Sequence, residues 1–329
     1  MKSSRILLVS TGGTIASRYK EDGSYSPVID ATGLIKEIPE ILNYAQYDTL
    51  NFASTLSFAL SPEQVFEMIN IIKETLQGDT YFGAIVTQGT ATMEETSFLA
   101  DLLWDSEKPL IFTGAMHNAS EMNYDGTRNI LDSVITASSD DAKGKGVLVC
   151  MAGEIHAARD VIKLHKTSSK AFYSVNFGPL GIINNNEAVF HRSPLRRNVY
   201  ITPRLENKID IIKVSFGIDA RLLKASIQSG AKGIVIESFP GNGGVTPEIA
   251  ELIKNINNKD VYFVSTPRAP MGSVYPKAGG GCGSWDLKEC GVIMGGDFTS
   301  VKARILLMVT LPIVKNHKEL EEIFRNNAP

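Results

Sequence analysis

The chain has 329 residues, of which 43% are hydrophobic and 21% charged, and its formal net charge is −3. This length and composition indicate an ordinary globular protein of about two domains. The small negative charge gives no electrostatic reason to expect nucleic acid or an anionic membrane as a partner. The first apolar run, at positions 6–9, is too short for a signal-peptide core or a membrane span, so we expect a cytoplasmic protein.

Short apolar runs alternate with helix-like segments in the N-terminal part of the chain. Each run is followed by Gly, Thr or polar residues, and the runs are residues 7–9, 84–86, 110–112 and 147–150. Helices are predicted between them, over residues 62–77 and 93–104. The first of these has apolar side chains at helical spacing and follows Ser61, which is predicted as its N-cap. The alternation predicts a parallel sheet covered by helices.

Residues 194–208 interrupt this alternation with two prolines and little periodic apolar sequence, and we expect them to link two domains. The alternation then resumes. Strands are predicted over residues 209–214, 233–236 and 261–264, and helices over residues 219–229, 246–255 and 299–310. The chain is therefore expected to form two α/β domains with mainly parallel sheets, a larger one over residues 1–193 and a smaller one over residues 209–329.

A glycine turn follows the first predicted strand and reads Ser-Thr-Gly-Gly-Thr-Ile at positions 10–15. Ligands of open α/β sheets bind outside the carboxyl ends of the strands, so Thr11 is expected among the reacting groups. Glycines such as Gly12 have no Cβ and let a substrate approach the main chain. A second segment follows the strand predicted at residues 84–86 and reads Thr-Gln-Gly-Thr-Ala-Thr-Met-Glu-Glu-Thr at positions 87–96.

The sequence does not point to a metal or another cofactor. Its three cysteines have no CxxC spacing, and its five histidines form no paired metal-ligand motif. The chemistry is therefore expected to depend on the side chains of the chain itself.

These segments, together with several others in the same order, resemble the bacterial-type asparaginase/glutaminase family over almost the whole chain. The other similar segments are Gly-Ala-Met at 114–116, Asp-Gly at 125–126, Arg-Asp-Val-Ile-Lys at 159–163, Asn-Phe-Gly-Pro-Leu-Gly at 176–181 and Lys-Ala-Arg at 302–304. The resemblance implies an N-terminal α/β domain that carries the nucleophile and a smaller C-terminal α/β domain. It also implies a homodimer or homotetramer whose active sites are completed across an intimate dimer.

The resemblance implies hydrolysis of a small-molecule amide through a threonine ester. It makes Thr11 the nucleophile and Tyr25 its hydrogen-bond partner on a mobile lid, with Tyr19 as an alternative to Tyr25. Thr90 and Lys163 match the second catalytic hydroxyl and the lysine beside it. These residue types suit the chemistry, because a threonine hydroxyl needs a base and a lysine can be one where desolvation lowers its pKa. The substrate site is expected to comprise Gly12, Ser57, Phe58, Gly89, Ala91 and Ala115.

The chain departs from the family in the pocket for the substrate's amino group. The family motif Gly-Thr-Asp-Thr here reads Gly-Thr-Ala-Thr at positions 89–92, so Ala91 replaces the carboxylate that binds the α-ammonium. In the family's Ser-Gln or Ser-Asp element, Ser57 is retained and an apolar Phe58 follows it, although Ser54 is an alternative match to Ser57. Each departure affects the recognition of a free α-amino group.

Leaving a buried ammonium without its carboxylate costs about 3–5 kcal/mol. We therefore expect hydrolysis of a carboxamide whose carrier has no free α-ammonium, such as an N-acylated asparagine or glutamine or a dicarboxylic acid monoamide. Ala91 and Phe58 would line the space for the acyl group. Two alternatives remain open. One is an ordinary L-asparaginase in which Asp286 or Glu154 replaces the missing acid, and the other is a non-catalytic binding or regulatory homologue.

Overall fold

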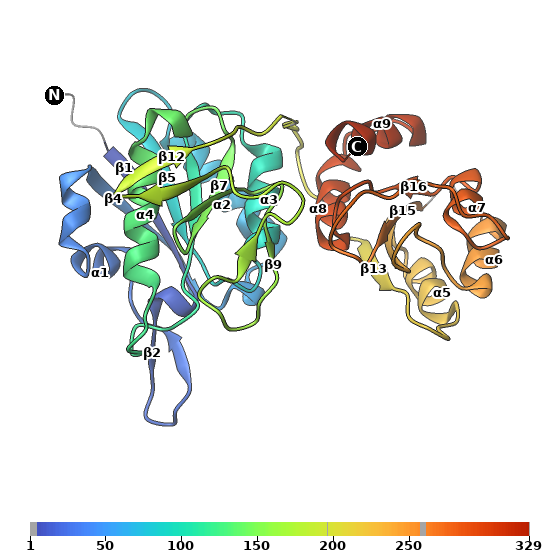
Figure 1. Ribbon diagram of the computed structural model, residues 1–329, viewed down its shortest axis with the longest axis horizontal. Helices are drawn as coiled ribbons and strands as arrows, with labels where there is room; N and C mark the ends of the chain where they lie inside the picture. The colour runs from blue at the N-terminus through green and yellow to red at the C-terminus, as the bar shows by residue number, and fades with distance from the viewer. Residues whose placement is uncertain (1–4, 196, 257–260, 329) are drawn as a thin grey trace. The chain divides into compact units, whose positions relative to one another are not determined.

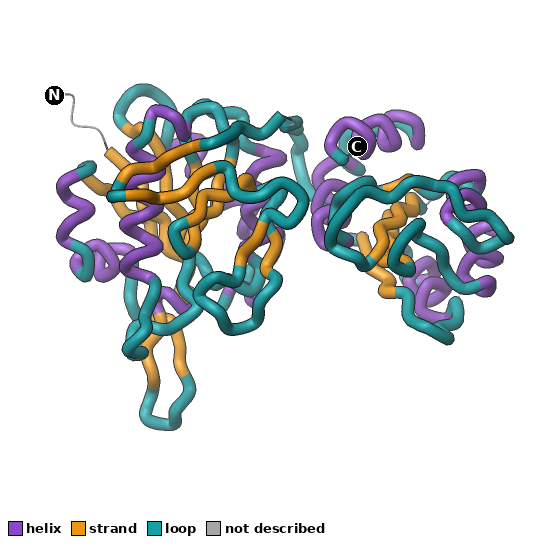
Figure 2. The backbone as a smooth tube through the Cα atoms, viewed as in Figure 1, coloured by secondary structure: helices purple, strands orange, loops and turns teal. Residues whose placement is uncertain are grey.

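A computed structural model describes residues 5–195, 197–256 and 261–328. The chain divides into two compact units, Met1–Val199 and Tyr200–Pro329, and strands alternate with helices in both (Figure 2). The division falls in a segment, residues 194–208, that has no helix or strand among its described residues. No helix in the described part of the chain is long and apolar enough to cross a membrane.

The N-terminal unit is built on an eight-stranded sheet with the strand order β12-β11-β8-β7-β6-β5-β1-β4. Five strands are parallel, and they are β1 (Arg5–Gly12), β4 (Gln46–Thr55), β5 (Tyr81–Thr87), β6 (Leu110–Thr113) and β7 (Val147–Met151). Three antiparallel strands extend the sheet beyond β7, and they are β8 (Glu154–Ala157), β11 (Gly181–Asn184) and β12 (Glu187–Phe190).

Helices cover this sheet. They are α1 (Ala31–Lys36), α2 (Pro62–Thr75), α3 (Met93–Leu103) and α4 (Gly126–Ser138). Ile6 and Leu8 of β1 share a buried cluster with Ile130 and Val134 of α4, whereas the alternate residue Leu7 points to the opposite face and is also buried. Both faces of the central strands are therefore packed, which explains why these strands read as continuous apolar runs.

The start of α2 follows the sequence prediction. The Ser61 hydroxyl accepts a hydrogen bond from the Gln64 backbone N–H, and the Gln64 side chain accepts one from the Ser61 N–H, which together form a capping box. Pro62 occupies the first helical position, where its missing N–H costs nothing. Ser61 is thus confirmed as the N-cap of this helix.

Short elements complete the N-terminal unit. They are the 3-10 helices η1 (Thr14–Ala16), η2 (Pro39–Asn43), η3 (Ser57–Ala59) and η4 (Asp140–Ala142), with the antiparallel pairs β2 (Ser17–Tyr19) with β3 (Tyr25–Pro27) and β9 (Ile162–Lys163) with β10 (Phe172–Tyr173). Figure 1 shows the β2–β3 hairpin, drawn in blue, projecting from the rest of this unit.

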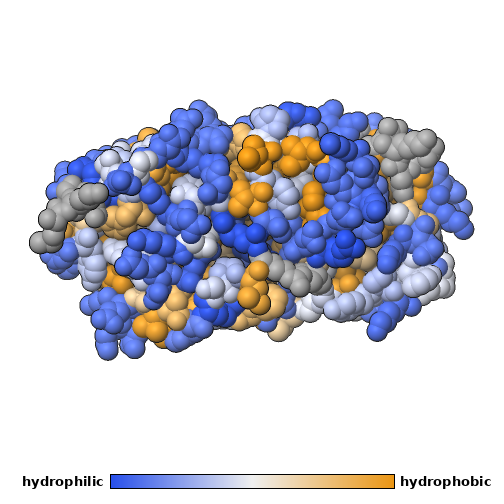
Figure 3. Space-filling view, turned by 90° about the horizontal axis from the view of Figure 1, so that it is seen from above, coloured by the Kyte–Doolittle hydropathy of each residue, from blue (hydrophilic) through white to orange (hydrophobic). Residues whose placement is uncertain are grey.

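The C-terminal unit has a four-stranded parallel sheet in the order β13 (Ile209–Lys213), β14 (Gly233–Ser238), β15 (Tyr262–Pro267) and β16 (Ile293–Met294). Its helices are α5 (Arg221–Gln228), α6 (Pro247–Asn255), α7 (Ser284–Glu289), α8 (Ser300–Thr310) and α9 (His317–Asn327). The predicted fold class, two α/β domains with mainly parallel sheets and the larger one first, is confirmed. The face drawn in Figure 3 is mainly hydrophilic, with separate hydrophobic patches, as expected for a folded protein surface.

Candidate active site

Two turns at the carboxyl ends of β1 and β5 meet in the N-terminal unit. Gly12 ends β1 and Gly13 follows it, with φ angles of 92° and 80°, a backbone conformation that favours glycine. A Cβ on Gly13 would overlap the backbone of Gly89, which lies after β5. Glycine at position 13 therefore allows the two turns to touch, and this brings the segments after both strands to one place.

A cavity of about 220 Å³ opens beside these turns. It is lined by Gly13, Thr14, Tyr25, Leu56, Ser57, Phe58, Gly89, Thr90, Ala91, Met116, Lys163 and Lys166. Seven of the predicted site residues are in this lining, and they are Tyr25, Ser57, Phe58, Gly89, Thr90, Ala91 and Lys163. The cavity is the size of a small organic molecule and lies outside strand ends, where open α/β sheets bind ligands.

Thr11, predicted as the nucleophile, does not line this cavity. Its side chain is 1% exposed, and its Oγ1 donates a hydrogen bond to the Thr87 carbonyl oxygen at 3.1 Å, which ties β1 to β5. The prediction treated the strand as ending before Thr11, whereas β1 continues to Gly12 and holds Thr11 inside the sheet. Thr14, which stands beyond both glycines, is the hydroxyl of the same motif that reaches the cavity. Thr14, rather than the predicted Thr11, is therefore the threonine of this motif that can contact a ligand in the cavity.

Two predicted substrate-binding residues also lie outside the lining. A Cβ on Gly12 would overlap the backbone of Thr55 at the end of β4, so this glycine faces the neighbouring strand. Ala115 is fully buried in the core cluster of the N-terminal unit, and the next residue, Met116, lines the cavity in its place.

Lys163 and Thr90 are in direct contact. Lys163 Nζ donates a hydrogen bond to Thr90 Oγ1 at 2.7 Å, and the backbone N–H of Lys163 donates to Glu94 Oε2 at 2.6 Å. Burial lowers the pKa of Lys163, while the negative charge of Glu94 opposes this shift. A lowered pKa makes a lysine easier to deprotonate and thus better able to act as a base, and here the hydrogen bond to Thr90 gives a route for the proton.

Ser57 offers the cavity an unused polar atom. It begins η3, its side chain is 3% exposed, and its Oγ has no hydrogen-bond partner among the described residues. A buried hydroxyl without a partner is costly, and a polar substrate group in the cavity would remove that cost. Phe58 is 69% exposed and forms an apolar wall beside it.

Tyr25 lies on β3 of the projecting hairpin and reaches the cavity lining. The alternative, Tyr19, contacts Tyr25 edge to face, with 6.5 Å between the ring centroids, but is not part of the lining. The geometry therefore favours Tyr25 over Tyr19 as the tyrosine at this cavity.

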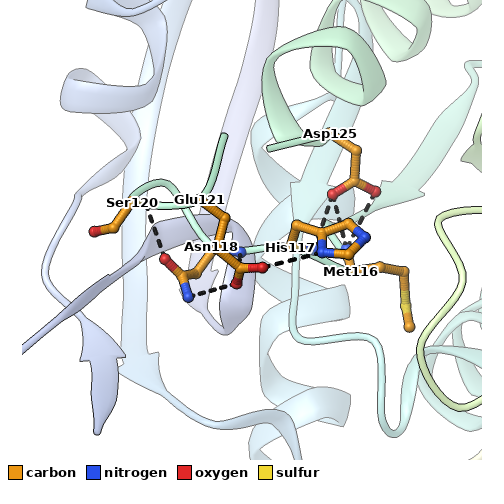
Figure 4. A network of polar contacts seen from close by, with 6 residues as sticks. All are labelled: Met116, His117, Asn118, Ser120, Glu121 and Asp125. Atoms are coloured by element: carbon orange, nitrogen blue, oxygen red, sulfur yellow. Dashed lines mark hydrogen bonds and ion pairs between the residues drawn. The ribbon is translucent and has the colours of Figure 1, made fainter. Parts of the chain in front are cut away.

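A polar network holds the Met116 side of the cavity (Figure 4). Asp125 Oδ1 accepts hydrogen bonds from the backbone N–H groups of Met116 and His117, both at 3.0 Å. Glu121 accepts from the Asn118 backbone and side chain and lies 3.1 Å from His117 Nδ1. These carboxylates orient the loop backbone, so the position of the Met116 side chain depends on them.

The cavity lining contains two lysines, Lys163 and Lys166, and no carboxylate. Neither candidate replacement acid is in it. Glu154 pairs with Lys170 at 2.8 Å, and Asp286 lies in the C-terminal unit, where its Oδ2 accepts hydrogen bonds from two backbone N–H groups of its own loop. Five lining residues were not predicted from the sequence, although two of them belong to the glycine motif, and they are Gly13, Thr14, Leu56, Met116 and Lys166.

Comparisons with known proteins agree with this arrangement. The family "Asparaginase, N-terminal" matches residues 5–196, and the "Glutaminase/Asparaginase C-terminal domain" matches residues 208–324. The chain is 34% identical to an L-asparaginase of Bacillus licheniformis over 94% of this chain and 96% of that protein. It is 28% identical to L-asparaginase 2 of Escherichia coli (strain K12) over 97% of this chain and 92% of that protein.

A solved structure is also similar. The crystal structure of a protein titled probable cytoplasmic L-asparaginase from Campylobacter jejuni superposes with a TM-score of 0.86 and 28% sequence identity, covering 98% of this chain and 99% of that one. Both parts of the chain thus match one family in sequence and in fold. The chain belongs to the asparaginase family, whose enzymes are hydrolases that act on amide C–N bonds.

Proposed function

We propose that this enzyme hydrolyses a side-chain carboxamide on a carrier that has no free α-ammonium. An N-acylated asparagine or glutamine, or a dicarboxylic acid monoamide, would fit this description. The observation that carries the proposal is the charge of the cavity lining, where Ala91 stands beside two lysines and no carboxylate is present. A free ammonium would find no counter-ion among these lining residues.

Acyl transfer from the amide to Thr14 is the reaction that these residues support. Thr14 Oγ1 attacks the amide carbon while its proton passes to the Thr90–Lys163 pair. The C–N bond breaks, the leaving nitrogen takes that proton, and ammonia departs from a Thr14 ester. Water then attacks the ester carbon, its proton returns to Thr14 Oγ1, and the carboxylate leaves. Splitting the reaction in this way replaces one difficult step with two easier ones.

Two other lining residues would orient the substrate. The unpaired Ser57 hydroxyl is a ready partner for a carboxylate or carbonyl oxygen. Tyr25, on the hairpin, would hydrogen-bond to Thr14 and shield the reacting atoms from water.

An ordinary L-asparaginase is the second candidate, because the relatives reported above carry that name. The non-catalytic alternative is disfavoured, because the cavity keeps Thr14, Thr90 and Lys163 together. The similarity to a protein titled cytoplasmic supports a cytoplasmic location, and the family resemblance supports a homodimer or homotetramer. Light scattering after size-exclusion chromatography would measure the oligomeric state.

Ammonia release from a panel of amides tests the proposal. The panel contains L-Asn, D-Asn, L-Gln, the N-acetyl and longer N-acyl forms of each, and succinamic acid, with Thr14→Ala as the inactive control. We expect the N-acyl or amino-free amides to be hydrolysed well above free asparagine. Strong turnover of free L-Asn would show instead that the ammonium finds another acid, and the proposal would fail.

A further inference from the structure

The loop after Lys163 brings a second cation, Lys166, to the cavity. We propose that Lys166 is a specificity-determining residue that binds an acidic group on the carrier end of the substrate. The substrate class would then be an N-acyl amide whose acyl chain ends in a carboxylate. This inference rests on the proposed function, because only a substrate whose α-amino group is acylated carries an acyl chain.

The backbone around Lys166 is held in a defined bend. His165 Nδ1 accepts hydrogen bonds from the backbone N–H groups of Thr167 and Ser168, at 3.1 and 2.8 Å. The backbone N–H of Leu164 donates to the Ala171 carbonyl oxygen at 2.9 Å and closes the base of the loop. Lys166 stands at the bend between these bonds, so an organised loop places this exposed residue in the cavity lining.

The other lysine of this loop shows what is particular about Lys166. Lys170 pairs with Glu154 at 2.8 Å and is not part of the cavity lining. Among the described residues, Lys166 forms no hydrogen bond or ion pair. The two lysines therefore differ in their pairing. The charge of Lys170 is paired with Glu154, whereas the charge of Lys166 is available to a ligand.

The rest of the lining favours a chain that is apolar along its length and anionic at its end. Phe58 and Ala91 offer apolar surface, while Lys163 already donates a hydrogen bond to Thr90. An ammonium is a compact charge with three donors and suits a single carboxylate. No lining carboxylate competes for Lys166, so an acidic substituent would take up its unpaired charge, and a cationic one would be repelled.

The test compares acyl chains of equal length with and without the terminal acid. The substrates are N-butanoyl and N-succinyl forms of L-asparagine and L-glutamine, which differ only at the end of the four-carbon chain. We expect the wild-type enzyme to prefer the succinyl form by roughly 3- to 5-fold in kcat/KM, mainly through KM, and to lose this preference at high salt. Lys166→Gln should abolish the preference, and Lys170→Gln should retain it.

Charge reversal gives a result that a merely structural role would not. Lys166→Glu should favour an N-(4-aminobutanoyl) amide over the succinyl one. Equal turnover of butanoyl and succinyl substrates, both above free asparagine, would overturn the role of Lys166 while leaving the proposed function intact. An equal loss of kcat/KM on both substrates in Lys166→Gln would also overturn the proposed role. Such a loss would mean that the lysine contacts a group that the butanoyl and succinyl substrates share. A preference for free asparagine would instead contradict the proposed function itself.

Discussion

Lys163 Nζ lies 2.7 Å from Thr90 Oγ1 and donates a hydrogen bond to it. The two residues stand 73 positions apart in the sequence, on β9 and on the turn after β5, and the fold brings them into contact as the proposed proton-transfer unit. Glu94, in the first turn of α3, accepts a hydrogen bond from the Lys163 backbone and so fixes where this unit sits. The protonation state of Lys163 is therefore set by its burial and by Glu94 together.

Replacement of Glu94 with Gln should shift the pH profile of the enzyme. Burial lowers the pKa of Lys163 and the Glu94 charge raises it, so removal of that charge lowers the pKa further. If neutral Lys163 is the base, the rising limb of the kcat/KM profile moves to lower pH. The plateau value should stay within about 3-fold of that of the wild type, because Gln can still accept the hydrogen bond from the Lys163 backbone. Glu95→Gln, which removes the same charge from the next residue, is the control. A limb that stays in place or moves to higher pH would contradict this role.

Substitutions at Thr14 and Thr11 should separate the two hydroxyls of the glycine motif. Thr14→Ala is expected to lower kcat/KM by at least about 10³-fold with little change in stability, because it removes the proposed nucleophile. Thr11→Val keeps the shape but loses the bond to the Thr87 carbonyl, so it should cost about 1–2 kcal/mol of stability and change activity less than about 10-fold. Ammonia release and thermal unfolding measure both effects. A folded but inactive Thr11→Val protein beside an active Thr14→Ala protein would reverse the assignment.

Introducing an acid at position 91 should change the substrate preference. Ala91→Asp places a carboxylate in a lining that has none, where it can pair with a substrate ammonium. We expect the ratio of kcat/KM for free L-asparagine to that for its N-acyl form to rise by about 10²-fold. Ala91→Asn has the same size without the charge and should leave most of the original preference. The same gain in both variants would show that size rather than charge decides the specificity.

Replacement of Asp132 with Asn should flatten the dependence of stability on pH. The Asp132 side chain in α4 is 1% exposed and lies 2.8 Å from Arg128 Nε; burial raises its pKa from 3.8 to about 6, and Arg128 opposes this shift. The native state therefore holds a proton that the unfolded state releases at lower pH. The free energy of unfolding should fall by roughly 2–3 kcal/mol as the pH rises from about 4 to about 7.

Asp132→Asn has no proton to lose at this position, so it should be more stable than the wild type above pH 6 and similar to it near pH 4. Arg128→Gln should steepen the fall, because it removes the charge that lowers the pKa of Asp132. Urea unfolding at several pH values and one protein concentration measures this. An unchanged slope in Asp132→Asn would assign the pH dependence to other groups.

The sequence predicted the elements that are marked by a helix cap or by a continuous apolar run. The helix expected over residues 62–77 is observed as Pro62–Thr75, because Ser61 and Pro62 define its start without help from the rest of the fold. The buried parallel strands were recognisable as apolar runs. The antiparallel strands β8, β11 and β12 were not predicted, because each has only four residues and owes its pairing to neighbours supplied by the tertiary structure.

The sequence by itself determined the family, the two α/β domains and most residues of the cavity lining, including Thr90, Ala91 and Lys163. These follow from residue types in a fixed order, which a sequence displays directly. Only the tertiary structure decided that Thr14 rather than Thr11 faces the cavity, that Ala115 is buried and that Lys166 reaches the lining. The physical reason is that the direction of a side chain depends on where its strand ends and how its loop returns, and the packing of distant segments sets both.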